Sequence, residues 1–166
     1  MSARPEPLTA HHRIEPFRSR EPELNDWLHS RARSSEIADT ARTYVATAAG
    51  DLVIGYYTLS GYSADRHRAP NRLGRNQPDP IPGVLIGRLA VDERFEGIGL
   101  GKALFRDALT RITVAAETNA TRAIFVDALH EEAARFWESR GFRPLRDEPL
   151  SLYMRMDDVR ATITAL

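Results

Sequence analysis

One short segment of the chain has the residue types and the spacing that bind a phosphate group. The segment Gly87–Lys102 reads GRLAVDERFEGIGLGK and contains the pattern Arg94-x-x-Gly97-x-Gly99-x-Gly101. Glycines let backbone N–H groups approach a phosphate closely, and the start of a helix adds a favourable dipole. The segment therefore predicts a site for a ligand that carries a pyrophosphate.

The flanks of this segment predict the elements that must position it. An apolar run, Val84–Val91, precedes the glycines and indicates a strand. A helix over residues 99–116 is indicated by apolar residues at helical spacing: Leu100, Ala103, Leu104, Ala108, Ile112 and Ala115. Two other glycine motifs are excluded, because a P-loop needs Ser or Thr where Ala103 stands and a dinucleotide fingerprint needs Gly where Lys102 stands.

A second segment whose residues could take part in binding or catalysis follows a predicted strand, Ala123–Ala128. It reads HEEAARFWESRGF over residues 130–142. Glu131 and Glu132 suit the start of a helix over residues 131–140, and Gly141 suits a left-handed cap after its end.

The remaining elements complete a single predicted α/β domain over residues 13–158. Pro22 begins a helix with Leu24, Trp27 and Leu28 on one face, which we expect to break near Ser34–Ser35. The other expected elements are a short helix Glu36–Ala41, strands Thr43–Ala48 and Leu52–Ser63 joined by a turn at Ala49–Asp51, and a last strand near Leu150–Met156.

Three segments carry weaker patterns. Residues 1–12 are expected to form a flexible arm, and residues 159–166 a tail with a short helix. Residues 64–82 contain four arginines and four prolines. This length of irregular chain suggests function or mobility rather than packing.

Composition limits the class of protein. The chain has 166 residues and no cysteine, which excludes disulfides, thiolate catalysis and cysteine zinc sites, and we expect no metal. No apolar run approaches the ~20 residues of a membrane span, and the polar N-terminus lacks a signal core, so we expect a cytoplasmic protein. The net charge is zero, although 22 of the 23 basic residues are Arg, which suits phosphate contacts or reflects codon bias.

The two segments together resemble the GCN5-related N-acetyltransferases, the GNAT superfamily. Arg94 to Gly99 is similar to the family's acyl-CoA signature, R/Q-x-x-G-x-G/A, and residues 130–142 are similar to its second landmark, N-x-x-A-x-x-F-Y-x-x-x-G-F. The resemblance covers roughly residues 14–156. It implies a mixed, mostly antiparallel sheet flanked by helices, in which two central parallel strands, here Val84–Val91 and Ala123–Ala128, splay apart.

The resemblance also implies acetyl-CoA as co-substrate. Leu89, Ala90 and Val91 would pair with the pantetheine arm, and Val91 N–H would polarise the thioester carbonyl. The pyrophosphate would be wrapped by Arg94, Phe95, Glu96, Gly97, Ile98, Gly99, Leu100, Gly101 and Lys102. Phe136 would pack on the pantetheine, and His130, which stands where the family has Asn, would help to hold it or would serve as a cap.

The proton donor to the departing CoA thiolate is an open question in this sequence. The family usually has a tyrosine at the position of Trp137, whose indole N–H can donate a hydrogen bond but cannot act as an acid. Three alternatives remain: water protonates the thiolate, Tyr153 on the last strand substitutes, or the enzyme is slow. Trp137 itself has a second interpretation as a packed core residue.

A longer series of short matches resembles the TacT-like and AtaT-like toxins of GNAT–ribbon-helix-helix toxin–antitoxin pairs. It runs from Leu24-x-x-Trp27-Leu28 through Gly55–Ser60 and Gly87–Asp92 to Val126–Ala128. The resemblance implies acetylation of the α-amine of aminoacyl-tRNA, a homodimer and a ribbon-helix-helix antitoxin. Candidate tRNA contacts, each with an alternative as a solvated surface charge, are Arg42, Arg66, Arg68, Arg72, Arg75 and Arg88.

Two other functions stay open at this point. One is a GNAT enzyme that acetylates a small amine or a protein N-terminus. The other is a non-catalytic acyl-CoA-binding module, which the replacement of the usual tyrosine by Trp137 would favour.

Overall fold

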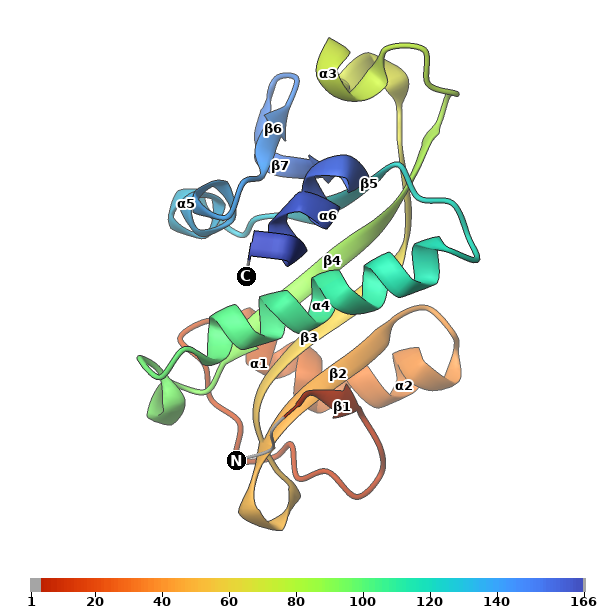
Figure 1. The fold of residues 1–166 in the computed structure, drawn as a ribbon. Coiled ribbons are helices and arrows are strands. Elements are labelled where there is room, and N and C mark those ends of the chain that lie inside the picture. Colours follow the sequence, from red (N-terminus) through yellow and green to blue (C-terminus); the bar gives the residue numbers. More distant parts are fainter. Residues whose placement is uncertain (1–3, 166) are drawn as a thin grey trace. The chain divides into compact units, whose positions relative to one another are not determined.

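The computed structural model describes residues 4–165, which form a mixed sheet with helices beside it (Figure 1). The strands are β1 (Glu6–Pro7), β2 (Arg42–Ala48), β3 (Leu52–Ala64), β4 (Ile81–Val91), β5 (Ala123–Asp127), β6 (Arg143–Leu145) and β7 (Glu148–Arg155). The α-helices are α1 (Pro22–Ser30), α2 (Ala32–Ile37), α3 (Asn71–Gly74), α4 (Leu100–Ala116), α5 (Glu131–Ser139) and α6 (Met156–Ala165). Short 3-10 turns are η1 (Ala49–Asp51), η2 (Arg66–Arg68) and η3 (Glu93–Phe95).

The strand order is β1-β2-β3-β4-β5-β7-β6. The pairs β1–β2, β2–β3, β5–β7 and β6–β7 are antiparallel, whereas β4 and β5 are parallel. The expected mixed, mostly antiparallel sheet with two central parallel strands is therefore confirmed.

The chain divides into two compact units, and β3, β4 and α4 each contribute to both. The first unit is Met1–Ser60 with Gly87–Ala108. Its core contains Phe17, Leu28, Val45 and Tyr56, all fully buried, and α2 lies beside β2 (Figure 1). The start of α4 packs closely on β3, because a Cβ on Gly55 would lie 3.0 Å from Leu104 Cδ1.

The second unit is Gly61–Ile86 with Leu109–Leu166. Its core gathers side chains from β3, β4, β5 and β7 with the segment before β4, and it includes Leu73, Ile81, Phe125 and Tyr153. Tyr62 packs on Phe125 with ring centroids 5.0 Å apart. Gly83 makes this packing possible, since a Cβ there would lie 2.3 Å from Phe125 Cε2.

Residues 64–82 are more ordered than their composition suggests. They contain η2 and α3, and three of their apolar side chains, Ala69, Leu73 and Ile81, lie in the core of the second unit. The sequence suggested function or mobility rather than packing, and the absence of packing was wrong, because apolar residues spaced among the arginines and prolines pack inward.

The start of the chain also differs from its expected form. The described part of the predicted arm contains β1, which pairs with β2, and Leu8 and His12 are buried. His12 Nε2 lies 2.8 Å from Glu6 Oε1, while its Nδ1 accepts a hydrogen bond from the Thr9 N–H group. These contacts fasten residues 6–12 to the first unit, although residues 1–3 lie outside the described residues.

Most other boundaries were predicted closely. The break between the first helices falls at Arg31, three residues before Ser34, and the last helix begins at Met156 rather than near Val159. The short strand β6 was missed, because its three residues carry no alternating pattern. Within the described residues, no helix has the length and apolar character needed to cross a membrane.

Candidate functional site

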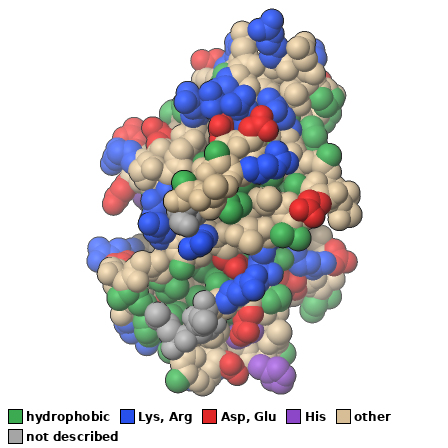
Figure 2. All heavy atoms as spheres, viewed as in Figure 1, with side chains coloured by type: hydrophobic (Ala, Val, Ile, Leu, Met, Phe, Trp, Pro, Cys, Tyr) green, Lys and Arg blue, Asp and Glu red, His purple; other side chains and the backbone are tan. Residues whose placement is uncertain are grey.

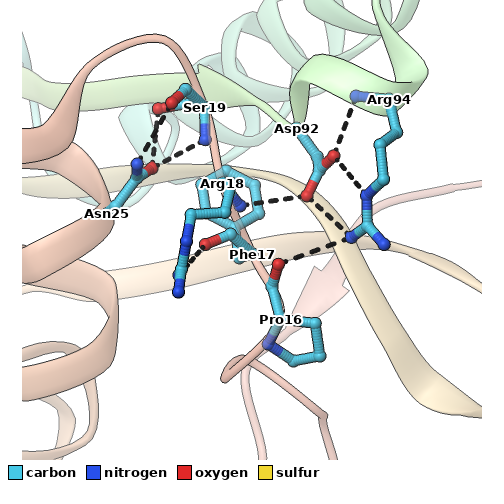
Figure 3. Close-up of polar contacts among 7 residues, drawn as sticks. All are labelled: Pro16, Phe17, Arg18, Ser19, Asn25, Asp92 and Arg94. Carbon is cyan, nitrogen blue, oxygen red and sulfur yellow. Dashed lines mark hydrogen bonds and ion pairs between the residues drawn. The ribbon is translucent and has the colours of Figure 1, made fainter.

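A buried carboxylate, Asp92, fastens the predicted phosphate-binding segment to the first unit (Figure 3). Asp92 directly follows β4 and is fully buried. It accepts hydrogen bonds from the backbone N–H groups of Arg18, at 3.0 Å, and Arg94, at 2.9 Å. The residue thereby fixes where the chain leaves the strand and begins η3.

Arg94, the arginine of the predicted motif, is held by the same carboxylate. Its Nε and Nη2 atoms each lie 2.9 Å from an Asp92 oxygen, and Nη2 also lies 3.5 Å from the Pro16 carbonyl oxygen (Figure 3). Burial alone would raise the pKa of Asp92, but the hydrogen bonds from Arg94 and Arg18 outweigh it and lower the pKa. Arg94 therefore ties the turn to the N-terminal segment, and its contact with a pyrophosphate stays a prediction.

The glycine turn has the backbone that the motif predicts. Gly97 and Gly99 have φ angles of +78° and +84°, which other residues rarely adopt, and nothing lies within 4 Å of a Cβ placed on either. Ala103 N–H donates the first intrahelical bond of α4, to the Gly99 carbonyl oxygen at 3.0 Å. The N–H groups of residues 100–102 therefore remain at the helix start, where anions bind.

The side chain of Glu96 is bound to Arg20. Both of its carboxylate oxygens accept from Arg20 Nε, at 3.0 and 2.9 Å. Phe95 lies under the Arg94 guanidinium, 5.9 Å from Cζ to the ring centroid, and Ile98 is exposed. Because Arg20 holds the Glu96 carboxylate, a contact of Glu96 with the pyrophosphate would have to come from its backbone, and that contact stays a prediction.

The end of β4 presents a backbone N–H group that points away from β3. The Asp92 N–H group donates to the Ile54 carbonyl oxygen of β3 at 2.8 Å. Because successive N–H groups of a strand point to opposite sides, the Val91 N–H group points away from β3. The parallel pairing of β4 with β5 covers only Gly83–Ile86 and Ala123–Val126, so Gly87–Val91 extend beyond it.

Arg88 lies on this extension and stacks on an aromatic column. Its Cζ atom is 3.9 Å from the centroid of Trp27, which stacks on Tyr56 with centroids 6.1 Å apart. The Tyr56 hydroxyl donates to the Leu24 carbonyl oxygen at 2.7 Å. Burial lowers the pKa of Arg88, while Tyr56 and Glu23 oppose the shift, so this guanidinium is partly desolvated and held in place.

In the second unit, His130 is the N-cap of α5. Its Nδ1 atom accepts from the Ala133 N–H group at 3.2 Å. The structure therefore supplies the capping role that the sequence left open, while a contact with pantetheine stays a prediction.

Trp137 is buried among aromatic rings, with 7% of its surface exposed. Its ring meets Phe136 and Phe142 edge to face, with centroids 5.1 and 5.3 Å apart. Phe136 is partly exposed and has the Arg140 guanidinium 4.1 Å above its ring. Trp137 therefore packs within this aromatic cluster, and a part of its indole in the chemistry stays a prediction.

Tyr153, the alternative proton donor, lies on β7 opposite Phe125. It is 2% exposed and belongs to the apolar core of the second unit. A hydroxyl donor from this position would have to act from within that core, and its catalytic role stays a prediction.

The predicted tRNA-contacting arginines are not equally available. Arg42 lies 3.2 Å from Glu36 Oε2 and 2.6 Å from Asp39 Oδ1, and these acidic partners raise its pKa. Arg68 and Arg72 pair with Glu148 and Asp158. Arg88, Arg66 and Arg75 have no ion pair with a carboxylate among residues 4–165.

Sequence reasoning missed two positioning residues, Asp92 and Trp27. The Asp92 signal was present, because aspartate is a preferred N-cap residue, and Asp92 caps η3 by accepting from the Arg94 backbone N–H group. The contact of Trp27 with Arg88 joins distant parts of the chain, so no local pattern marks it.

Comparisons with known proteins agree with this geometry. A model of the acetyltransferase (GNAT) domain family matches residues 39–144. A tRNA-acetylating toxin of Mycobacterium tuberculosis (strain ATCC 25618 / H37Rv) is 42% identical over 147 residues, which cover 89% of this chain and 88% of the relative.

Two solved structures are similar over nearly the whole chain. AtaT complexed with acetyl-methionyl-tRNAfMet matches with a TM-score of 0.86 and 29% identity, covering 95% of this chain and 96% of that one. A tyrosine-to-phenylalanine variant of the AtaT toxin, bound to the C-terminus of the antitoxin AtaR and to acetyl-CoA, matches with a TM-score of 0.82 and 28% identity, covering 96% and 97%.

Proposed function

The chain belongs to the GNAT acetyltransferase family, and from that premise we propose that it is a toxin that transfers the acetyl group of acetyl-CoA to the α-amine of aminoacyl-tRNA. An acetylated α-amine cannot form a peptide bond, so the reaction stops translation. The proposal is supported by the tRNA-acetylating relative and by the AtaT complex with acetylated methionyl-tRNA.

The main structural support for acetyl transfer is the backbone of one continuous segment, which runs from Val91 through the glycine turn to the start of α4. The Val91 N–H group points away from β3 and lies beyond the parallel pairing of β4. The N–H groups of residues 100–102 lie at a helix start behind two glycines with positive φ. This segment would hold both the thioester carbonyl and the pyrophosphate of acetyl-CoA by its backbone.

The transfer needs few side chains. The neutral α-amine nitrogen attacks the acetyl carbonyl carbon, the carbon–sulfur bond breaks, and the amine proton ends on the CoA sulfur. Val91 N–H stabilises the oxyanion that forms on the carbonyl oxygen. An aminoacyl α-amine has a pKa of roughly 7–8, so much of it is neutral near pH 7 and a strong base is unnecessary.

The thiolate of CoA has a pKa of about 8.5, so water can protonate it. This makes a dedicated acid dispensable at position 137. The burial of Trp137 among Phe136 and Phe142 is consistent with a packing role.

Arg88 is the best supported contact for the tRNA substrate. It lies on the same strand as Val91 and is oriented by Trp27, and its charge has no carboxylate ion pair among the described residues. A desolvated guanidinium of this kind binds phosphate strongly.

The proposal also includes the binding partner, the oligomeric state and the cellular location of the protein. The structure of AtaT with the C-terminus of the antitoxin AtaR supports an antitoxin as partner, and the ribbon-helix-helix type of that antitoxin follows from the resemblance alone. A homodimer and a cytoplasmic location follow from the resemblance to such toxins, and sedimentation of the purified protein tests the dimer.

Cell-free translation tests this function. The protein should block synthesis only when acetyl-CoA is present, and added fresh aminoacyl-tRNA should restore synthesis transiently. A block without acetyl-CoA would favour a binding module. Synthesis that continues despite acetyl-CoA would favour an enzyme for a small amine or a protein N-terminus.

A further inference from the structure

The arginines of residues 64–82 fall into two groups by their partners. Arg68 pairs with Glu148 and also donates to the Tyr62 hydroxyl at 3.3 Å. Arg72 lies 2.8 Å from Asp158. The charges of these two arginines are compensated within the second unit, so they are poor candidates for binding another anion.

Arg66 and Arg75 have no carboxylate partner for their side chains among residues 4–165. The Arg66 guanidinium donates to the Gln77 carbonyl oxygen at 3.1 Å, and only its backbone N–H group meets an acid, Asp79, at 3.0 Å. The Arg75 side chain forms no hydrogen bond or ion pair with the described residues, and it is exposed. Their positive charges are therefore available.

A third uncompensated arginine comes from the turn between β6 and β7. Arg146 donates from Nε to the Ala69 carbonyl oxygen at 3.0 Å and from Nη2 to Asn71 Oδ1 at 3.4 Å. Both acceptors are neutral. They orient this guanidinium without cancelling its charge.

These three arginines line one open cavity of about 400 Å³. His67, Asn71 and Asn76 supply further polar groups, and the described residues contribute no aspartate or glutamate to the lining. Figure 2 shows several Lys and Arg side chains, with some Asp and Glu side chains beside them, at this end of the second unit near α3 and β6. The lining thus contains the three arginines that have no carboxylate partner among the described residues, whereas Arg68 and Arg72, which are paired with carboxylates, are not part of it.

We propose that this cavity binds a backbone phosphate of the tRNA substrate. Guanidinium groups from two segments fit the oxygens of a phosphodiester, and the amide groups can contact the adjoining sugar. The lining exposes more polar than apolar surface, which disfavours a hydrophobic protein segment. The inference rests on the proposed function, because that function supplies the tRNA.

The test compares the double variant R66Q/R75Q with R72Q, a control from the same segment whose charge is already compensated. Affinity for deacylated tRNA is measured by fluorescence anisotropy across a salt series, and KM and kcat are measured for acetylation of aminoacyl-tRNA. The double variant should raise KM about tenfold with kcat unchanged, and its salt slope should fall by about 1–2. R72Q should change each quantity less than about twofold, and both variants should bind acetyl-CoA normally.

Unchanged tRNA affinity and salt slope in R66Q/R75Q would overturn the inference. The same unchanged values together with weaker antitoxin binding would also overturn it, and would assign the cavity to an acidic protein segment. If the natural protein acetylates no aminoacyl-tRNA, the proposed function fails, and the anisotropy series still decides whether the cavity contacts nucleic acid.

Discussion

At the scale of single residues, Asp92 shows how one buried carboxylate can organise a binding segment. It accepts hydrogen bonds from Arg18 and from both the backbone and the side chain of Arg94. These bonds lower its pKa below the ordinary value of 3.8. Its stabilising contribution is therefore fully present above that value and is lost as the pH falls through the lowered pKa.

Asp92→Asn should lower the free energy of unfolding by about 2 kcal/mol near pH 7, because hydrogen bonds to a buried charge are strong. Urea unfolding of both proteins measures the difference. It should stay constant down to about pH 5 and shrink below about pH 4. A difference that grows at acidic pH would contradict the assigned direction of the pKa shift.

Trp137→Phe tests whether the indole packs or takes part in the chemistry. Because aromatic rings surround it, phenylalanine should fill most of the site, and kcat should stay within about threefold of the natural protein. Circular dichroism confirms the fold, and steady-state acetyl transfer measures kcat. A loss of a hundredfold or more with an intact fold would mean that the indole N–H group acts in the reaction.

At the scale of elements, the glycine turn before α4 depends on backbone shape and on the absence of negative charge. Gly99→Asp should abolish acetyl-CoA binding, whereas Gly99→Asn should retain part of it, because asparagine tolerates positive φ and carries no charge. Isothermal titration with acetyl-CoA distinguishes the two. Normal affinity in Gly99→Asp would refute the pyrophosphate assignment.

The parallel pairing of β4 with β5 depends on Gly83. Gly83→Ala would place a Cβ 2.8 Å from the Ala123 carbonyl oxygen as well as against Phe125, and it should cost about 1–3 kcal/mol of stability. Gly61→Ala, on β3, meets nothing within 4 Å and serves as the matched control. Thermal unfolding compares them, and equal melting temperatures would show that β4 adjusts without strain.

Elements that are continuous in sequence were predictable. β4, the glycine turn and α4 follow one another in the chain. Hydrophobic spacing and the glycines at positions 97 and 99 therefore predicted them, and the structure gives both glycines a positive φ. The capped helix α5, with His130 at its start and Gly141 after its end, was recognised for the same reason.

Contacts between distant segments were not predictable. Nothing local indicates that Trp27 supports Arg88 or that Glu148 pairs with Arg68. The sequence alone therefore predicted six arginines as tRNA contacts without ranking them. Their ion pairs in the folded chain show which of these charges are compensated and which are not. The packed segment around Leu73 was missed for the same reason, since its apolar residues become a pattern only against β5 and β7.

At the scale of the whole molecule, the net charge is zero, but the arginine charges are not all compensated locally. Several arginines are paired with carboxylates, whereas Arg88 and the three arginines of the cavity near α3 have no such pair within residues 4–165. A protein can thus be neutral in total and still present local sites for a polyanion.

The most direct measurement is acetyl transfer from radiolabelled acetyl-CoA to total aminoacylated tRNA, with uncharged tRNA as the control. A toxin that acetylates aminoacyl-tRNA should place label on charged tRNA alone, and alkaline hydrolysis should release that label as an N-acetylated amino acid. Measurable acetyl-CoA binding without any label on charged tRNA would show that aminoacyl-tRNA is not the substrate.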